Sequence, residues 1–154
     1  ITADSFLTLT NVGQSGGDIT SSGFVYLNNS RVDGAITASA LVANAFPETN
    51  NLNILGGAIV CSATTVINGY GVAATVSSAG DARLTNSTFN ALVSAASIYA
   101  QDCTFNNGLS IAAAASKLID CTFSSPNTVT FTGPPGVLTV DAATYDGSSA
   151  MAFS

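Results

Sequence analysis

The chain contains one short phrase, Asp-Cys-Thr-Phe, at residues 102–105 and again at residues 120–123. A looser copy, Asn-Ser-Thr-Phe, occupies residues 86–89. A catalytic motif normally occurs once, whereas a phrase that returns at a similar interval is typical of a repeated structural unit. This repeat constrains the fold more strongly than any other feature of the sequence.

Weaker copies extend the repeat over the whole chain. Each unit has an alternating segment rich in Val, Ile, Leu and Thr, then Asn or Asp, a small residue and a large apolar residue, and closes on Gly, Asn or Ser. Intervals of 16 to 22 residues separate eight such units, with a mean of about 19 residues. The equivalent large residues are predicted to be Val12, Val32, Ile54, Tyr70, Phe89, Phe105, Phe123 and Tyr145.

The repeat predicts an all-β fold. Alternating apolar segments between Gly, Asn and Ser clusters indicate strands, and units this short leave no room for a βαβ crossover, which needs about 30 residues. Each strand should therefore stack on its equivalent one coil away, as a β-solenoid of about eight coils and about 38 Å at the usual spacing. We expect a single domain over residues 1–154, with 137–154 as the last coil or C-terminal edge.

Two Ala-rich segments, residues 90–101 and 109–119, fit a short helix as well as a strand. Strands are preferred because both segments lie within the best-preserved units. The run 112–115 would then form a narrow corner, and the proline pair at 134–135 a turn before the last coil.

Alternation along the strand assigns side chains to the two faces. Phe123 must point inward, so Ile119 and Cys121 are expected inside with it, while Asp120 and Thr122 point outward. The same reasoning gives a buried ladder and two external columns. The inward residues are Phe89, Phe105, Phe123, Ser87, Cys103 and Cys121, and the external columns are Asn86, Asp102, Asp120 and Thr88, Thr104, Thr122.

Composition excludes several classes of function. The chain has no His, three Lys or Arg residues and a net charge of −6, so it has no basic surface for nucleic acid or an anionic membrane and no Ser-His-Asp triad. Cys61, Cys103 and Cys121 lack zinc-type spacing and are expected to be small buried residues, and neither a metal nor a cofactor is predicted. No run approaches the length of a membrane span.

The surface is predicted to be unusually poor in charge. Only 8% of residues are charged, against about 25% in ordinary soluble domains. Such a surface indicates that part of it is covered by another chain, so we expect a homo-oligomer.

Paired carboxylates are the serious candidate for enzyme chemistry. Asp102 and Asp120 should lie on adjacent coils, with Asp141 continuing their column, and glycoside hydrolysis needs two carboxyl groups about 5–9.5 Å apart. Any repeat that contains Asp gives the same spacing, so a solvated or hydrogen-bonded Asp ladder is the alternative. The external Thr column raises an ice-binding alternative, but Arg31 takes the equivalent place in an earlier unit.

The segments LIDCTFSSPN, YAQDCTFNNG and RLTNSTFNA resemble the degenerate repeat of right-handed parallel β-helix proteins, the pectin-lyase-like superfamily. The resemblance implies a right-handed coil. It identifies no reaction, because members include polysaccharide lyases and hydrolases, phage tailspikes and fibres, and surface adhesins. Lyases of this kind commonly use Arg or Lys with acidic calcium ligands, whereas Arg31 and Arg83 lie about three coils apart by the repeat count.

These observations favour a non-enzymatic structural or attachment module of an extracellular or virion-surface fibre, excised from a longer chain. The resemblance to phage fibres implies a homotrimer. Surface glycans or a receptor are the expected partners, at exposed loops such as 44–51 or 124–127. The alternatives are a β-helix glycoside hydrolase that uses paired Asp residues and an adhesin or ice-binding solenoid.

Overall fold

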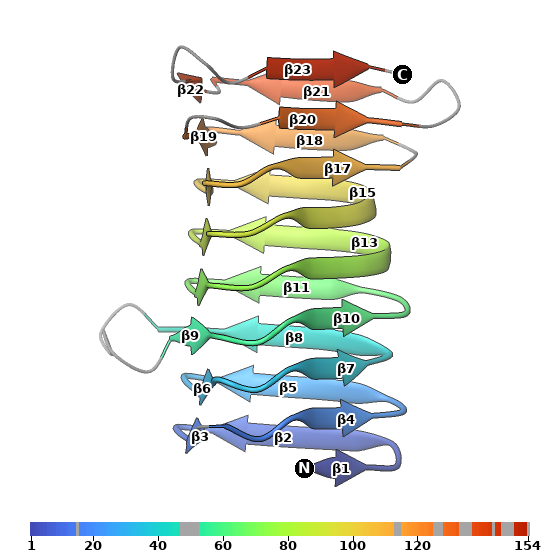
Figure 1. The fold of residues 1–154 in the computed structure, drawn as a ribbon, viewed down its shortest axis with the longest axis vertical. Helices are drawn as coiled ribbons and strands as arrows, with labels where there is room; N and C mark the ends of the chain where they lie inside the picture. The colour runs from blue at the N-terminus through green and yellow to red at the C-terminus, as the bar shows by residue number, and fades with distance from the viewer. Residues whose placement is uncertain are drawn as a thin grey trace.

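The chain forms a parallel β-solenoid of about seven turns (Figure 1). The computed structural model describes residues 1–14, 16–46, 53–112, 115–124, 128–132, 137–142, 144–145 and 150–153. Every regular element within these residues is a strand, and none of them belongs to a helix long and apolar enough to cross a membrane. The prediction of an all-β solenoid is confirmed.

Three faces of parallel strands wrap around one interior. The first face contains β1 (Thr2–Ala3), β4 (Ile19–Ser21), β7 (Ile36–Ala38), β10 (Ile59–Cys61), β17 (Leu109–Ile111), β20 (Thr128–Phe131) and β23 (Ala150–Phe153). The second face contains β2 (Phe6–Thr10), β5 (Phe24–Asn28), β8 (Ala40–Asn44), β11 (Thr65–Asn68), β18 (Ser116–Ile119) and β21 (Leu138–Asp141). Two long strands, β13 (Val76–Thr85) and β15 (Val93–Gln101), bend between these faces and belong to both.

The third face is narrow, because each of its strands has two residues. It contains β3 (Gly13–Gln14), β6 (Arg31–Val32), β9 (Ile54–Leu55), β12 (Gly71–Val72), β14 (Thr88–Phe89), β16 (Thr104–Phe105), β19 (Thr122–Phe123) and β22 (Thr144–Tyr145). These eight stacked strands span seven intervals, which is why eight repeat units make about seven turns. Strands of the first face run in one direction in front and those of the second face return behind them as the chain rises, so the coil is right-handed (Figure 1).

Strand register shows where the predicted equivalences were right and wrong. Val32, Phe89, Phe105, Phe123 and Tyr145 share one column of the third face, as predicted. The other members of that column are Gln14, Leu55 and Val72, in place of the predicted Val12, Ile54 and Tyr70.

The errors at these three positions differ in size, because Ile54 lies one residue from the column and Val12 and Tyr70 each lie two residues from it. A slip of one residue along a strand exchanges its inward and outward faces, and Ile54 is the outward neighbour of the buried Leu55. Tyr70 is buried but lies two residues before the column, and its hydroxyl accepts a hydrogen bond of 3.2 Å from the Ser30 N–H. An inward aromatic ring therefore does not by itself define the register.

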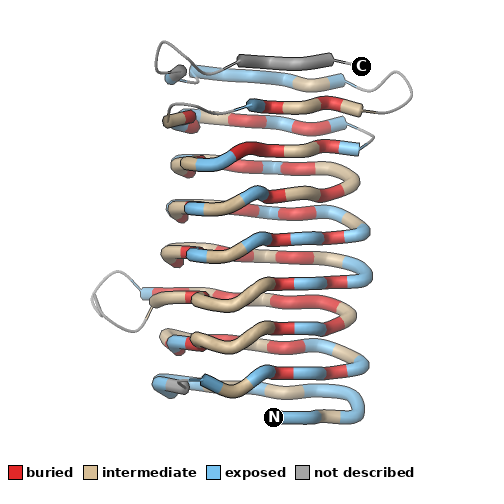
Figure 2. Tube along the Cα trace, viewed as in Figure 1, coloured by how far each residue is buried: buried red, intermediate tan, exposed pale blue. Residues whose placement is uncertain are grey.

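A continuous apolar core fills the coil. Between β4 and β20, buried residues alternate with less buried ones along most strands, as Figure 2 shows. In the third face Phe89, Phe105 and Phe123 are fully buried, and their rings stack with centroids 5.2 and 5.3 Å apart and planes 13° apart.

The corner between the second and third faces explains the repeated phrase. In seven turns the residue at this corner has a left-handed backbone conformation, which Asn, Asp and Gly tolerate best. These corner residues are Asn11, Asn29, Gly69, Asn86, Asp102, Asp120 and Ala142. In four of these turns the next residue is a small, buried Ser or Cys. Ser30, Ser87, Cys103 and Cys121 each donate a hydrogen bond to the backbone carbonyl two residues earlier. The phrase is thus a corner residue, a corner-closing side chain, an outward Thr and an inward Phe.

The same corner overturns one predicted face assignment. Ile119 was expected inside with Cys121 and Phe123, but Leu118 takes the buried position and Ile119 is half-buried. Alternation does not continue through Asp120, because its positive φ of 48° redirects the chain. The described parts of the Ala-rich segments form strands, as preferred. Half of the 112–115 corner and all of the 134–135 turn lie outside the described residues.

Candidate binding surfaces

The predicted carboxylate column has a structural explanation. Asp102 and Asp120 are exposed and occupy equivalent corners of adjacent turns, where each holds a left-handed backbone conformation. Asp141 does not continue their column, because it pairs with Ile119 and the corner of that turn is Ala142. The corners of Asp102 and Asp120 are one rung apart, about 4.8 Å along the stack, and other turns fill the same corner with Asn, Gly or Ala.

Substitutions at Asp120 separate a backbone role from a chemical one. We expect Asp120→Asn and Asp120→Gly to leave the free energy of unfolding within about 0.5 kcal/mol, and Asp120→Ala to lower it by about 1 kcal/mol, because a Cβ-bearing residue without a short polar side chain is strained at positive φ. Urea unfolding of the three variants provides the measurement. A folded Asp120→Asn protein that had lost a polysaccharide-hydrolysing activity of the parent would instead assign the carboxylate to catalysis.

The three cysteines lie inside the coil as free thiols. Burial raises the pKa of the Cys103 thiol to about 12, and it raises the pKa of Cys61 and Cys121 as well. A raised pKa keeps these groups protonated near neutral pH, so they lack the thiolate that nucleophilic chemistry requires. Within the described residues, no cluster of three or more potential metal ligands is present.

Thiol labelling is expected to report unfolding. At pH 8 the folded protein should react with a thiol-specific reagent only as fast as it opens, whereas in denaturant all three thiols should react at once. The unfolded chain releases the Cys103 proton at a lower pH than the folded chain, so the free energy of unfolding should fall as the pH rises from about 9 towards about 12. Rapid labelling of the native protein at pH 8 would contradict the buried placement.

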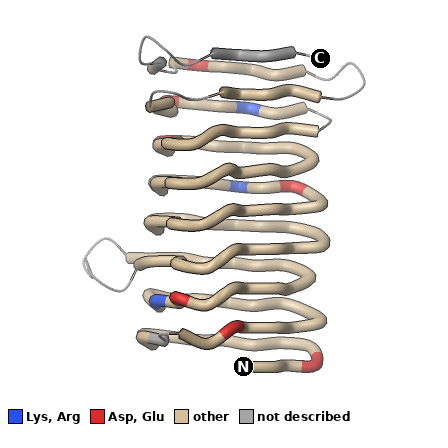
Figure 3. The backbone as a smooth tube through the Cα atoms, viewed as in Figure 1, with Lys and Arg blue, Asp and Glu red and all other residues tan. Residues whose placement is uncertain are grey.

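The outward side of the second face carries the most chemically distinctive surface of the described chain. Arg83, Tyr99 and Lys117 occupy the same outward column on three successive rungs, in β13, β15 and β18. Figure 3 shows how sparse charge is elsewhere on the coil. We call these three residues the cation–tyrosine column.

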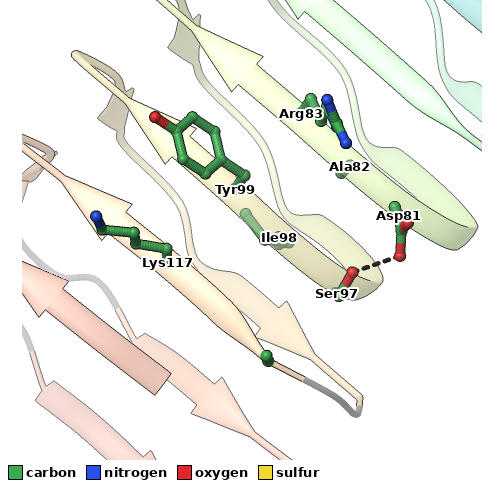
Figure 4. Close-up of a pocket in the computed structure, with 8 residues that line it drawn as sticks. Asp81, Ala82, Arg83, Ser97, Ile98, Tyr99 and Lys117 are labelled. Atoms are coloured by element: carbon green, nitrogen blue, oxygen red, sulfur yellow. Dashed lines mark hydrogen bonds between the residues drawn. The ribbon is translucent and has the colours of Figure 1, made fainter. Parts of the chain in front are cut away.

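The cation–tyrosine column is open to solvent. Tyr99 is 39% exposed, and the side chains of Arg83 and Lys117 are exposed on either side of its ring (Figure 4). Within the described residues the ion pair is that between Arg31 and Asp33 on the third face, and neither Arg83 nor Lys117 forms one. Both cations are therefore available to an anion from outside the chain.

Two shallow depressions adjoin the column. One of about 230 Å³ lies between Arg83, Tyr99 and Lys117 and extends to Asp81 and Ser97, whose hydroxyl donates to the Asp81 carboxylate. The other, of about 440 Å³, is lined by Val66, Arg83, Thr85 and Tyr99. A ligand that lies along the axis of the coil can contact both.

A polar column runs beside the cations. Asn68, Thr85 and Gln101 are in register on the same face, two residues further along each strand. The Thr85 hydroxyl donates a 2.9 Å hydrogen bond to the side-chain amide oxygen Oδ1 of Asn68, and the Tyr99 hydroxyl donates a 3.0 Å bond to Oε1 of Gln101. These contacts orient amide and hydroxyl groups next to the exposed ring.

The sequence contains a signal for the cation–tyrosine column that the initial interpretation missed. Arg83, Tyr99 and Lys117 are separated by 16 and 18 residues, the same intervals that separate Phe89, Phe105 and Phe123. Residues that share the repeat interval share a column, so the periodicity alone places these three side chains together.

Hydroxyl side chains form a longer column on the first face than the one predicted on the third. The third-face column contains Thr88, Thr104, Thr122 and Thr144, and Gly71, Ile54 and Arg31 continue it. The outward column of the first face consists of Thr2, Thr20, Thr37, Val60, Ser77, Ser94, Ser110 and Thr130. Among the described strands of this face, Val60 interrupts the hydroxyl groups and Ala152 follows Thr130 in register.

The loops predicted to bind glycans fall largely outside the described part of the chain, since 47–52 and 125–127 are not described. No family model, curated protein or solved structure matches this chain. The case for a function therefore depends on the surfaces of the described residues.

Proposed function

We propose that this chain is a non-enzymatic structural and attachment module of an extracellular or virion-surface fibre, and that it attaches to glycans through the second face. The fibre role is supported by the elongated solenoid with its buried core and its low charge. The attachment role is supported by one observation above all, the exposed Tyr99 ring between two unpaired cations. Aromatic faces flanked by hydrogen-bonding groups suit sugar rings, which present both C–H and hydroxyl surfaces.

Binding to immobilised oligosaccharides tests the attachment role. We expect the parent protein to bind a subset of neutral and acidic glycans, and Tyr99→Ala to weaken that binding at least about tenfold, the effect of losing about 1.4 kcal/mol. Leu92→Ala is the control, because Leu92 is an exposed apolar residue, 43% accessible, that lies just before β15 and away from the second face. Absence of glycan binding by the folded parent would overturn the attachment role, and loss through Leu92→Ala alone would place it elsewhere.

The fibre role carries an expectation of side-by-side association, with a homotrimer favoured. Three aromatic residues, Phe6, Phe24 and Tyr26, cluster on the outside of the first rungs of the second face with centroids 5.3 and 6.1 Å apart. Phe6 is 59% exposed, and exposed apolar clusters of this kind commonly mark protein contacts. Sedimentation should give three times the monomer mass, and a monomer at micromolar concentration would remove the support for a trimeric fibre.

Ice binding is a second candidate, favoured by the hydroxyl column of the first face. Eight rungs present seven Ser or Thr side chains at the regular spacing of a parallel sheet, about 4.8 Å. If this face binds ice, the protein should depress the freezing point below the melting point, and Thr37→Lys should abolish that effect while Thr104→Lys on the third face leaves it intact. No separation of the two temperatures in the parent protein would remove this candidate.

A further inference from the structure

We infer that the cation–tyrosine column binds an acidic glycan whose negative charges fall on alternate sugars, aligned with the axis of the coil. This inference rests on the proposed attachment function and names the class of ligand that the same face takes. It is carried by the juxtaposition of Arg83 and Lys117 on either side of the exposed Tyr99 ring.

The spacing of the cations selects the spacing of the ligand's charges. Arg83 pairs with Tyr99 and Tyr99 with Lys117, so the cations are two rungs apart, about 10 Å at the usual strand separation. A pyranose in an extended chain advances by about the length of one rung. A carboxylate or sulfate on every second sugar therefore reaches each cation in turn, while the intervening sugar lies over Tyr99.

The flanking groups favour a sugar between the charges. Gln101 accepts from the Tyr99 hydroxyl through its carbonyl oxygen, which leaves its amide N–H₂ group as the donor beside the ring. Thr85 supplies a hydroxyl on the adjacent rung. These are uncharged donors and acceptors of the kind that pair with sugar hydroxyl or acetamido groups, and they adjoin the ring rather than the cations.

Charge disfavours a densely charged polymer. The chain has a net charge of −6, and the Asp81 carboxylate lies at the border of the site, held by Ser97. A nucleic acid or a uronic acid homopolymer places a charge at every unit, so about half of its charges would face the uncharged ring or the Asp81 carboxylate. A ligand with a charge on alternate units avoids both.

Four probes of similar length test the inference by calorimetry at low and physiological salt. The first is a hexasaccharide in which glucuronate alternates with N-acetylglucosamine. The others are an N-acetylglucosamine hexamer, a galacturonate hexamer and a hexathymidylate. We expect the alternating hexasaccharide to bind at least about tenfold more tightly than the other three, with an affinity that falls as salt is raised.

Single substitutions test which cationic side chains bind the charges of the alternating hexasaccharide. Arg83→Ala and Lys117→Ala should each weaken binding of the alternating hexasaccharide about tenfold, as expected for loss of a charge-assisted hydrogen bond. Tyr99→Phe should retain most of the affinity. Arg31→Ala, which removes an equal charge from the third face, should have no effect. All of these side chains are exposed or half-exposed, and the melting temperature of each variant verifies that the coil remains intact.

The outcomes separate this inference from the proposed function. Equal binding of the alternating and the uncharged hexamers through Tyr99 would overturn the charge-spacing inference and leave glycan attachment standing. Tighter binding of the galacturonate hexamer or of hexathymidylate would also overturn it and indicate a site for a dense polyanion. If neither this set nor the immobilised glycans bind, both proposals fail.

Discussion

Phe105→Ala is expected to lower the free energy of unfolding by about 3–5 kcal/mol, the usual cost of truncating a buried phenylalanine. The ring is fully buried and lies between those of Phe89 and Phe123, at 5.2 and 5.3 Å. The cavity left behind is unable to collapse freely, because β16 is paired with β14 on one side and β19 on the other. Loss of two ring contacts adds to the lost burial.

Two further variants test whether the loss of stability in Phe105→Ala comes from the buried, stacked ring. Phe24→Ala, at a ring that is about half exposed, should cost less than about 1 kcal/mol, and Phe105→Leu should fall between the two because it retains most of the buried volume. Urea unfolding, followed by circular dichroism, measures all three. If Phe105→Ala costs no more than Phe24→Ala, the stacked rings are not a principal source of stability.

The sequence predicted the Phe stack because two independent constraints coincide in those turns. The corner demands Asn, Asp or Gly, and the interior there admits a large ring, so Asn86, Asp102 and Asp120 each precede a phenylalanine by three residues. In earlier turns the interior position is filled by Val32, Leu55 or Val72, residues that are common throughout the chain. Without a distinctive residue to mark the register, Val12 and Ile54 were placed wrongly.

The binding surface was harder to predict than the core for a physical reason. Packing restricts inward residues to apolar side chains, which makes the repeat visible, whereas outward positions accept almost any residue. The column that contains Arg83, Tyr99 and Lys117 begins with Thr8 and Tyr26 and ends with Thr139. Thr, Tyr, Val, Arg and Lys all occur along it and no single residue type marks the column. Only the intervals, read after the core repeat is known, reveal that these side chains are neighbours.

Gly57→Ala is expected to destabilise the protein by about 3 kcal/mol, at the upper end of the usual cost of overpacking. A Cβ at residue 57 would lie 2.3 Å from the carbonyl carbon of Gly34 and 2.4 Å from the Ala35 nitrogen, both of them backbone atoms of the turn below. Neither atom can move aside by a rotamer change, so relief requires two turns to separate where Ile36 and Ile59 are paired. The φ of Gly57 is not among the positive values, so the cost is steric rather than conformational.

Gly71→Ala provides the matched control, because residue 71 also lies between stacked turns of the coil. Its nearest atom to an added Cβ is the Asn53 carbonyl oxygen at 3.8 Å, an ordinary contact. Ala there should be neutral or should stabilise the protein by up to about 1 kcal/mol, since it restricts the unfolded chain. Thermal and urea unfolding of both variants test the pair. If the two variants change stability equally, the close approach of the turns at Gly34 and Gly57 does not limit the size of the side chain tolerated there. The expected contrast would show that these glycines set how closely neighbouring turns pack.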